Sequence, residues 1–319
     1  MVITSLFFNL LQSIIIIVAL ILVSLLLKMK SIITEDHKPL FGRLITDFAL
    51  PALIFATLSR HAFNLDNLLP AGMMLGSKLA CLMIAWLIGR SLHLERPQLG
   101  AFILVAGFGS SSTLGYSLIS QTFPNNPNAM TDALIISELG AGIPIFTIGV
   151  AIAIFFGSHR SSRSQLRSGV MSFFTSPIFL SLVLGLAVSF LSIPLNNPIF
   201  VLIYRVLDTI GGSLVLFVAI AIGLMLKPID SKTLFPLILA VAIVKLVIEP
   251  ALAFVFVNII TIPSIESEVL LIESAMPSGT VAAVIAYRYG CDGSIASALV
   301  IATYVLSLFT LPIITMLMM

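Results

Sequence analysis

The chain has 319 residues, of which 59% are hydrophobic and only 9% are charged, and its formal net charge is +2. Charged residues make up about a quarter of an ordinary soluble domain, so this composition excludes a soluble protein and predicts an all-α integral membrane protein. The small net charge is spread through short joints, which excludes a nucleic-acid-binding surface.

The two cysteines, Cys81 and Cys291, lie far apart in the sequence, and no Cys/His cluster with metal-ligand spacing is present. We expect both to be free thiols that pack as small apolar side chains. The sequence therefore predicts neither a metal site nor another cofactor.

About twenty apolar residues span a bilayer, and cutting the sequence at its polar or turn-rich joints predicts ten membrane-spanning helices. Joints such as residues 124–127 and 194–198 are rich in proline and asparagine, which end helices. The ten expected spans are residues 3–27, 41–59, 70–89, 99–121, 130–157, 170–191, 199–226, 233–258, 267–287 and 294–318.

Lysine and arginine set the expected orientation, because cytoplasmic loops carry the excess of these residues. With the N-terminus outside, only Arg60 falls in an outer loop. The inner loops then hold Lys28, Lys30, Lys38, Arg43, Arg90, Arg96, Arg160, Arg163, Arg167, Lys227, Lys232 and Arg288. The sequence thus predicts a multi-pass protein of the cell (inner) membrane with both termini outside.

A basic cytoplasmic loop at residues 158–169 divides the spans into two halves of five, residues 1–157 and 170–319. An odd number of spans in each half inverts the second half in the membrane, which predicts two inverted five-helix repeats. Similar residues recur in the same order in both halves, in the pairs Asp47 and Asp208, Pro70 and Pro236, and Lys78 and Lys245.

Charged residues inside spans cost about 2.5–3.5 kcal/mol each and are interpreted as functional by default. Arg205 with Asp208, and Lys245 with Glu249, are spaced to neutralise each other on one helical face. This spacing favours two structural ion pairs.

Lys78, Glu138 and Glu273 have no partner on their own span and are candidate coupling or support residues. Lys78 on the third span and Glu138 on the fifth could meet across the bundle. Burial and a neighbouring lysine change the proton affinity of a carboxylate in opposite senses, so such a pair could couple transport to a proton. A purely structural pair is the alternative.

Two spans are interrupted by polar residues, the fourth segment (residues 99–121) and the ninth segment (residues 267–287). Helices broken inside a membrane are tolerated where protein or a polar cavity satisfies the backbone, and paired breaks in two halves are typical of secondary transporters. Half-helix N-termini offer free N–H groups and positive dipole ends, which suit a carboxylate. The expected substrate-binding residues are Ser110, Ser111, Ser112, Thr113, Gly115, Ser117, Pro277, Ser278, Gly279 and Thr280.

The sequence contains few features that are typical of an enzyme active site. No hydroxyl, histidine and acid stand at a recognised spacing, and no HExxH, GxSxG or phosphate-loop motif is present. We therefore expect a protein that is not an enzyme.

Several motifs resemble a known family. Residues 273–278 (ESAMPS), 286–292 (AYRYGCD) and 303–312 (TYVLSLFTLP) resemble the C-terminal signature of the auxin efflux carrier family. Residues 47–55 (DFALPALIF) resemble the helix 2 signature of the same family, which is part of the bile/arsenite/riboflavin transporter superfamily. The resemblance covers essentially the whole chain.

The resemblance implies the fold of sodium/proton antiporters and bile-acid symporters, with two inverted repeats whose broken helices 4 and 9 cross. It implies a scaffold of helices 1, 2, 6 and 7 and a moving transport domain of helices 3, 4, 5, 8, 9 and 10. Pro277 matches the proline of the family's crossing point. Ser110 and Ser117 stand where many members have asparagine and proline, and Val281 replaces a polar residue, so the carboxylate-binding asparagine has no counterpart.

We therefore expect a secondary active or facilitative transporter that exports small organic anions, such as auxin-like or dicarboxylic acids, by alternating access. Protons are the favoured coupling ion, with sodium less favoured, and a homodimer in the lipid bilayer is left open. Two alternatives remain, a sodium-coupled organic-anion symporter of the bile-acid type and a membrane receptor that binds a ligand without moving it.

Overall fold

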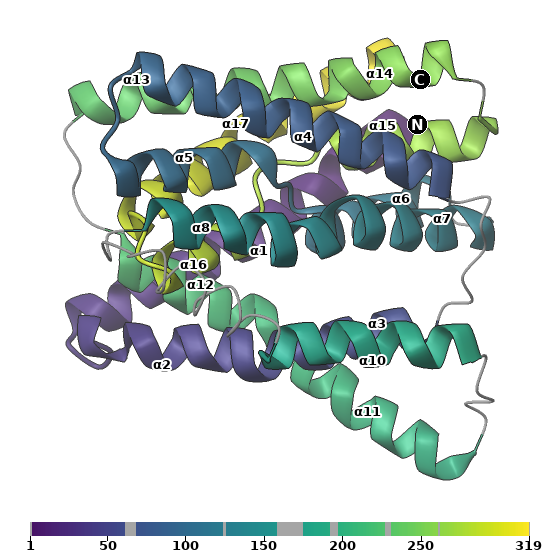
Figure 1. The fold of residues 1–319 in the computed structure, drawn as a ribbon, viewed down its shortest axis with the longest axis horizontal. Helices are drawn as coiled ribbons and strands as arrows, with labels where there is room; N and C mark the ends of the chain where they lie inside the picture. Colours follow the sequence, from purple (N-terminus) through teal and green to yellow (C-terminus); the bar gives the residue numbers. More distant parts are fainter. Residues whose placement is uncertain are drawn as a thin grey trace. The chain divides into compact units, whose positions relative to one another are not determined.

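The computed structural model describes residues 2–60, 68–123, 126–157, 175–191, 197–226, 231–260 and 262–318. In these ranges the chain is almost entirely helical (Figure 1), and extended pairing is confined to an isolated antiparallel bridge between Gly109 and Ser278. The prediction of an all-α protein is confirmed.

Within the described residues, six helical stretches are long and apolar enough to cross a membrane. They are Glu35–Arg60, Leu68–Ser91, Asp132–Phe156, Pro198–Met225, Leu234–Ile259 and Gly293–Ile314. Two further expected spans coincide with the apolar helices α1 (Val2–Met29) and α10 (Pro177–Leu191). The fourth and ninth segments are each divided into shorter helices, so their predicted interruptions are confirmed, while the count of ten spans stays a prediction.

The chain divides into two compact units. The smaller unit comprises residues 20–65 and 160–224, and the larger one comprises residues 1–19, 66–159 and 225–319. Besides parts of α1 and α12 (Leu214–Met225), the smaller unit contains η1 (Glu35–His37), α2 (Lys38–Arg43), η2 (Leu44–Ala49), α3 (Leu50–Arg60), α10 and α11 (Pro198–Gly212).

The larger unit holds both broken segments. Its first-half elements are α4 (Leu68–Ser91), α5 (Arg96–Gly107), η4 (Ser111–Gly115), α6 (Tyr116–Thr122), α7 (Pro127–Ser137), η5 (Glu138–Gly142), η6 (Ile145–Gly149) and α8 (Val150–Phe156). Its second-half elements are α13 (Ser231–Ala242), η7 (Ile243–Ile248), α14 (Glu249–Ile259), α15 (Ser264–Ser274), α16 (Thr280–Arg288) and α17 (Gly293–Met318).

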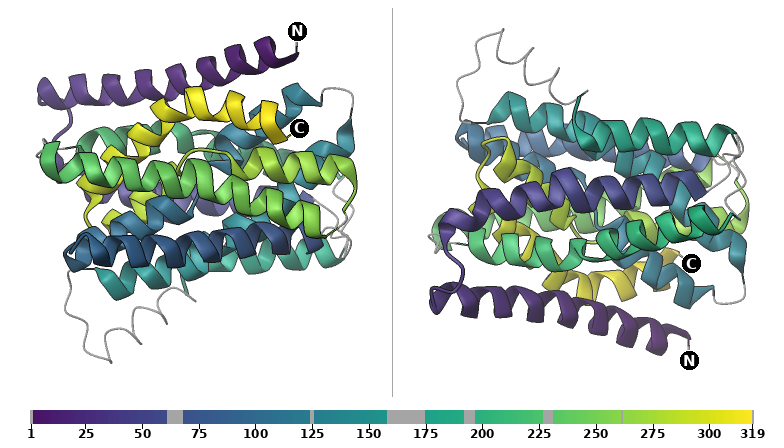
Figure 2. Two further views of the ribbon diagram at one scale, coloured as in Figure 1. Left: turned by 90° about the horizontal axis from the view of Figure 1, so that it is seen from above. Right: turned by 90° about the horizontal axis from the view of Figure 1, so that it is seen from below.

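Three π-helical stretches end two residues before a proline. They are η2 before Pro51, η5 before Pro144 and η7 before Pro250. Proline has no N–H, and its ring displaces the carbonyl group four residues earlier, so the preceding turn widens. The wide turn η7 carries Lys245 and leads to Glu249, and α13, η7 and α14 continue as one long helix (Figure 2).

The two broken segments lose their helical form for different reasons. In the ninth segment, Pro277 cannot donate a backbone hydrogen bond and disfavours a helical conformation at Met276, so α15 ends and α16 starts afresh. The fourth segment has no proline at its break. There Gly107 and Gly109 flank Phe108, whose backbone is extended with φ −119° and ψ 126°.

The breaks satisfy each other's backbone groups. The Ser110 N–H donates to the Pro277 carbonyl oxygen at 2.7 Å, and the Gly279 N–H donates to the Phe108 carbonyl oxygen at 2.8 Å. Unpaired backbone groups would cost several kcal/mol each in a membrane interior. The bridge therefore allows both helices to end inside an apolar environment. It also brings the two broken segments together.

In the smaller unit, α10 and α11 pack against α3. The Arg60 guanidinium donates to both carboxylate oxygens of Asp208, at 2.9 and 2.7 Å, and lies 4.4 Å from the centre of the Tyr204 ring. The Tyr204 hydroxyl in turn donates to Ser59 Oγ at 2.7 Å. The predicted pair of Arg205 with Asp208 is wrong, because Asp208 is bound from the neighbouring helix α3.

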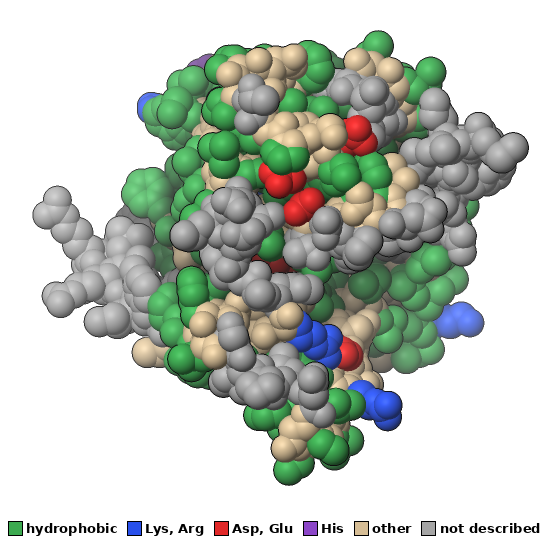
Figure 3. Space-filling model, turned by 90° about the vertical axis from the view of Figure 1, so that its right-hand side faces the viewer, with side chains coloured by type: hydrophobic (Ala, Val, Ile, Leu, Met, Phe, Trp, Pro, Cys, Tyr) green, Lys and Arg blue, Asp and Glu red, His purple; other side chains and the backbone are tan. Residues whose placement is uncertain are grey.

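Large apolar side chains are exposed on many helices, among them Leu87 on α4, Leu202 on α11 and Phe309 on α17. Figure 3 shows one face on which hydrophobic side chains alternate with acidic and basic ones. Lipid chains are the environment that the exposed apolar side chains of these helices fit.

A substitution tests the close approach at the bridge. A β-carbon at Gly279 would lie 2.8 Å from the carbonyl oxygen of Gly109, a backbone atom that cannot move away as a side-chain end can. We expect Gly279→Ala to lower the free energy of unfolding by about 1–3 kcal/mol, measured by thermal unfolding in detergent.

Gly72→Ala on α4 is the matched control, because nothing lies within 4 Å of a β-carbon there. Alanine is the better helix former, so this variant is expected to unfold at the same temperature as the parent or slightly higher. Equal unfolding temperatures for both variants would refute the close approach.

Candidate functional site

Buried polar side chains surround the bridge between the broken segments. Ser110, Ser111 and Ser278 are at most 3% exposed, and Thr280 is 8% exposed at the first turn of α16. The structure thus brings together residues that the sequence assigned to one site from two distant segments. The backbones of Ser112, Thr113 and Ser117 belong to η4 and α6, while their side chains lie outside the described part of the structure.

Helix α17 supports both segments at the bridge. The Tyr304 hydroxyl donates to Ser110 Oγ at 2.7 Å, and the Ser278 N–H donates to Thr303 Oγ1 at 3.2 Å. Both α17 side chains are buried. The sequence pattern did not single them out for the site, although adjacent polar side chains in the middle of an apolar span were a usable signal.

Two hydroxyl groups beside the bridge have no partner. Ser111 Oγ and Ser278 Oγ are buried and make no hydrogen bond to any residue that the structure describes. Leaving a polar group in this state costs about 1–3 kcal/mol, so each hydroxyl is able to bind a polar ligand atom at a gain. Both residues were expected to bind the substrate.

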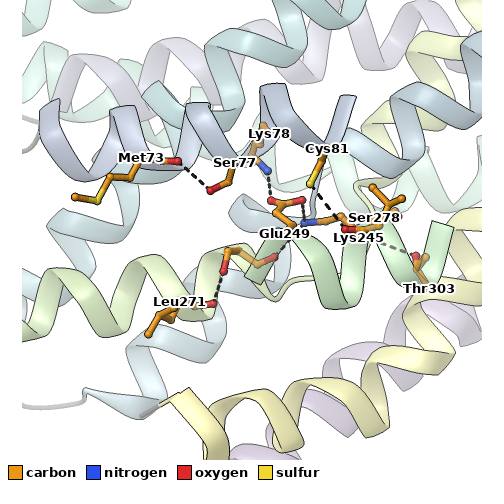
Figure 4. Close-up of polar contacts among 11 residues, drawn as sticks. Met73, Ser77, Lys78, Cys81, Lys245, Glu249, Leu271, Ser278 and Thr303 are labelled. Carbon is orange, nitrogen blue, oxygen red and sulfur yellow. Dashed lines mark hydrogen bonds and ion pairs between the residues drawn. The ribbon is translucent and has the colours of Figure 1, made fainter. Parts of the chain in front are cut away.

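A charged triad lies next to the bridge (Figure 4). The Lys78 ammonium donates to Glu249 Oε1 at 2.8 Å, and the Lys245 ammonium donates to Glu249 Oε2 at 2.6 Å. All three residues are fully buried. The predicted pair of Lys245 and Glu249 is confirmed, whereas the suggested meeting of Lys78 with Glu138 is wrong because Lys78 binds Glu249 instead.

The triad is joined to the ninth segment through Lys245. Its ammonium also donates to the Ser274 carbonyl oxygen at 3.2 Å, in the last turn of α15. A β-carbon at Gly109 would lie 2.9 Å from the same nitrogen. The cation therefore stands at the carbonyl end of α15, where a positive charge is favourable, and also touches the break of the fourth segment.

Glu138 has a different partner. Its Oε1 accepts a hydrogen bond at 2.8 Å from the hydroxyl of Tyr116, the first residue of α6, and its side chain is partly exposed. Glu138 therefore contacts the fourth segment through the Tyr116 phenol and not through a lysine.

Glu273, the remaining candidate acid, lies on the last turn of α15 and is fully buried. Neither carboxylate oxygen has a hydrogen-bond partner among the described residues. Its carboxyl group packs on the backbone of Gly115, where a β-carbon would lie 2.5 Å from Oε1 and 2.7 Å from Oε2. The ninth segment thus places an unpartnered acid against the fourth.

A metal ion is the other ligand that grouped acids can hold. Within the residues that the structure describes, no group of three or more His, Cys, Asp or Glu side chains is placed to bind one. The site is therefore described by its hydroxyls, its charged triad and its two acids.

Comparison with known proteins identifies the class. The family described as membrane transport proteins matches residues 9–161 and 157–315, almost the whole chain. The chain belongs to this membrane transport family. The resemblance to auxin efflux carriers that the motifs indicated is thereby confirmed.

Relatives in archaea extend the match. A protein named "Uncharacterized transporter MJ1031" from Methanocaldococcus jannaschii is 28% identical over 304 residues, which cover 93% of this chain and 95% of the relative. A protein named "Uncharacterized transporter" from Methanothermobacter thermautotrophicus is 22% identical over 311 residues, covering 95% and 96%. The family and these relatives identify the chain as a multi-pass helical membrane protein of the transporter class.

Substitutions of different residues of the triad are expected to lower the free energy of unfolding by different amounts. Glu249→Gln leaves two buried lysines without a carboxylate, and removing one partner of a buried pair costs about 3–5 kcal/mol. Lys78→Met leaves one lysine opposite one carboxylate, so we expect it to cost clearly less. Chemical unfolding of the detergent-solubilised protein measures both values.

Asp208→Asn is the control for loss of a charge pair outside the triad. Its pair with Arg60 is more than one-third exposed on both sides, so the expected cost is below about 1 kcal/mol. If Lys78→Met destabilises the transporter as strongly as Glu249→Gln does, the triad does not carry one excess positive charge.

Proposed function

We propose that the protein is a secondary transporter of small organic anions and that the substrate binds where the fourth and ninth segments meet. The observation that carries the proposal is the backbone bridge between two broken helices, with the free hydroxyls of Ser111 and Ser278 beside it. Broken helices at one depth are the usual substrate site of secondary transporters. The match to a family of membrane transport proteins supports the same class.

The electrostatics of the site favour an anion. Two lysines share one glutamate in the triad, which leaves one formal positive charge. The helices η4 and α16 begin at the bridge, and the N–H groups of a first helical turn have no partner within the helix. Free N–H groups, hydroxyl groups and an excess cation together suit a carboxylate.

The division into compact units supports a moving part and a static part. Both broken segments and the triad belong to the larger unit, which we take as the transport domain, while α3, α10 and α11 belong to the smaller unit, which we take as the scaffold. In this proposal the larger unit carries the bound anion between the two sides by alternating access. Its side chains Lys78, Glu138 and Glu273 act in support or coupling.

The proposed topology has ten spans in two inverted repeats with both termini outside. It is supported by the two family matches, which overlap at residues 157–161, at the start of the basic loop that separates the halves. In this proposal the protein lies in the inner membrane and exports its substrate.

Uptake of labelled organic acids into proteoliposomes tests the function. We expect at least one of indole-3-acetate, malonate and malate to cross. Ser111→Ala and Ser278→Ala should each weaken its binding by about 3- to 10-fold, because one hydrogen bond contributes about 0.5–1.5 kcal/mol. Ser91→Ala, at the exposed end of α4, should leave uptake unchanged.

Two results would overturn the proposal. Binding of these acids without any uptake would make the protein a receptor instead. Uptake that is unaffected by both serine variants would move the substrate site away from the bridge. Uptake that requires a sodium gradient would favour the bile-acid type of symport and would leave the place of the substrate site unchanged.

A further inference from the structure

We propose that Glu273 is the proton-binding site of this transporter and that it takes up one proton together with one organic anion. The inference rests on the proposed function, because it concerns the ion that accompanies the substrate. It is carried by the surroundings of Glu273, by the charge of the triad and by the contact of the acid with the fourth segment.

The surroundings of Glu273 favour a neutral acid. The side chain is fully buried, and neither of its oxygens has a hydrogen-bond partner among the described residues. The hydroxyl of Ser111 is also buried, and it makes no hydrogen bond to any described residue by distance and angle. An ionised carboxylate left without partners in an apolar interior is far more costly than a protonated one, and a protonated carboxyl can itself donate to a hydroxyl or to a substrate oxygen.

The other ionisable groups around Glu273 are already engaged. Helix α15 packs against α4, α7, α14, α17 and η4. From these elements and their immediate neighbours come Lys78 on α4, Lys245 in η7, Glu249 on α14, Asp132 on α7, Tyr304 on α17, Tyr116 on α6 and Glu138 in η5. Both lysines bind Glu249, Tyr304 binds Ser110, and Tyr116 binds Glu138.

The charge of the triad links the proton to the anion. Lys78 and Lys245 contribute two positive charges, and Glu249 contributes one negative charge. An ionised Glu273 would balance the remaining positive charge, so an incoming anion would meet a neutral site. A protonated Glu273 leaves that charge for the anion. Each ligand therefore strengthens the binding of the other, as reciprocal coupling requires.

The step is a simple proton transfer. A hydronium ion transfers a proton to the Glu273 carboxylate and leaves water when the site is open to one side, and the carboxyl group returns the proton to water when the site is open to the other side. One proton and one monoanion carry no net charge together. Transport of a monoanion is therefore expected to be electroneutral and to respond to a pH gradient.

The contact with Gly115 connects the protonation of Glu273 to the substrate site. The carboxyl group rests on the backbone of η4, the helix that begins at the bridge. Glu138, an acid for which the sequence suggested a coupling or a structural role, is partly exposed and already bonded to Tyr116. Its ionised form is therefore not isolated, and Glu273 is the better proton site.

Infrared spectroscopy tests whether Glu273 binds a proton, and it needs no substrate. In pH-difference spectra of the membrane-reconstituted protein, we expect a C=O band of a protonated carboxyl group that is absent in Glu273→Gln. The band should remain in Glu138→Gln and in Glu268→Gln, a control on the same helix. A spectrum of Glu273→Gln identical to that of the parent would overturn the inference.

Flux measurements test the coupling. A pH gradient of about one unit sustains about tenfold accumulation of a monoanion that moves with one proton. With labelled indole-3-acetate, the monoanion in the uptake panel, we expect the parent protein and Glu268→Gln to reach this accumulation faster than protein-free vesicles, which admit the neutral acid by diffusion. Glu273→Gln, a permanently neutral side chain, should exchange the acid across the membrane but accumulate it no faster than protein-free vesicles do.

The two proposals fail in different ways. If the parent protein moves none of the labelled acids, the transport function fails, while the infrared band still decides whether Glu273 binds a proton. If the parent accumulates indole-3-acetate and Glu273→Gln accumulates it equally, the proton site is refuted and the transport function stands. Should Glu273→Gln not fold, Glu273→Asp keeps an acid at the position and is expected to shift the band, and an unshifted band would refute the assignment.

Discussion

The structure depends on how two helices can stop inside a membrane without leaving backbone groups unpaired. The solution is mutual, since Ser110 donates to the Pro277 carbonyl and Gly279 donates to the Phe108 carbonyl. Water could satisfy these groups in a soluble protein, but a lipid interior offers none. The pairing requires glycine where the backbones approach, and it places two new helix starts, η4 and α16, at one point. The polar site around the bridge is thus a consequence of the way in which the backbone is satisfied.

The charged triad can be understood from the same constraint. Burying charges is tolerated when they are paired and hydrogen-bonded, and Glu249 accepts from both lysines. Lys245 also reaches the carbonyl end of α15, which an unbroken helix would not expose. An excess cation near the bridge therefore stabilises the broken helix and attracts an anion at the same time. In this arrangement one set of side chains serves both stability and binding.

Sequence patterns could predict what lies along one helix but not what meets across helices. The spacing of Lys245 and Glu249 and the interruption of the ninth segment are local features, and both were predicted correctly. The partners of Lys78 and Asp208 depend on helix rotation and packing, which periodicity does not determine, so both predicted pairs were wrong. The support from Tyr304 and Thr303 was missed for the same reason. A break of the fourth segment was predicted from its hydroxyl groups and glycines, although the structure alone shows what the break pairs with.

The two breaks are unequal, and the difference indicates where substrate preference is determined. In the ninth segment, proline produces the break, and Thr303 and Lys245 already occupy the Ser278 N–H and the Ser274 carbonyl. In the fourth segment, glycines produce the break and Ser111 keeps a free hydroxyl. On the ninth segment the free polar atoms are Ser278 Oγ and the Glu273 carboxyl group, which packs on Gly115 of the fourth segment. A bound anion gains the most binding free energy at polar atoms that have no other partner. The free-energy cost of removing water from those atoms has already been met when the protein folded. We therefore expect changes around Ser111 and Gly115 to alter which acid is carried, and changes around Pro277 to alter whether the site forms at all.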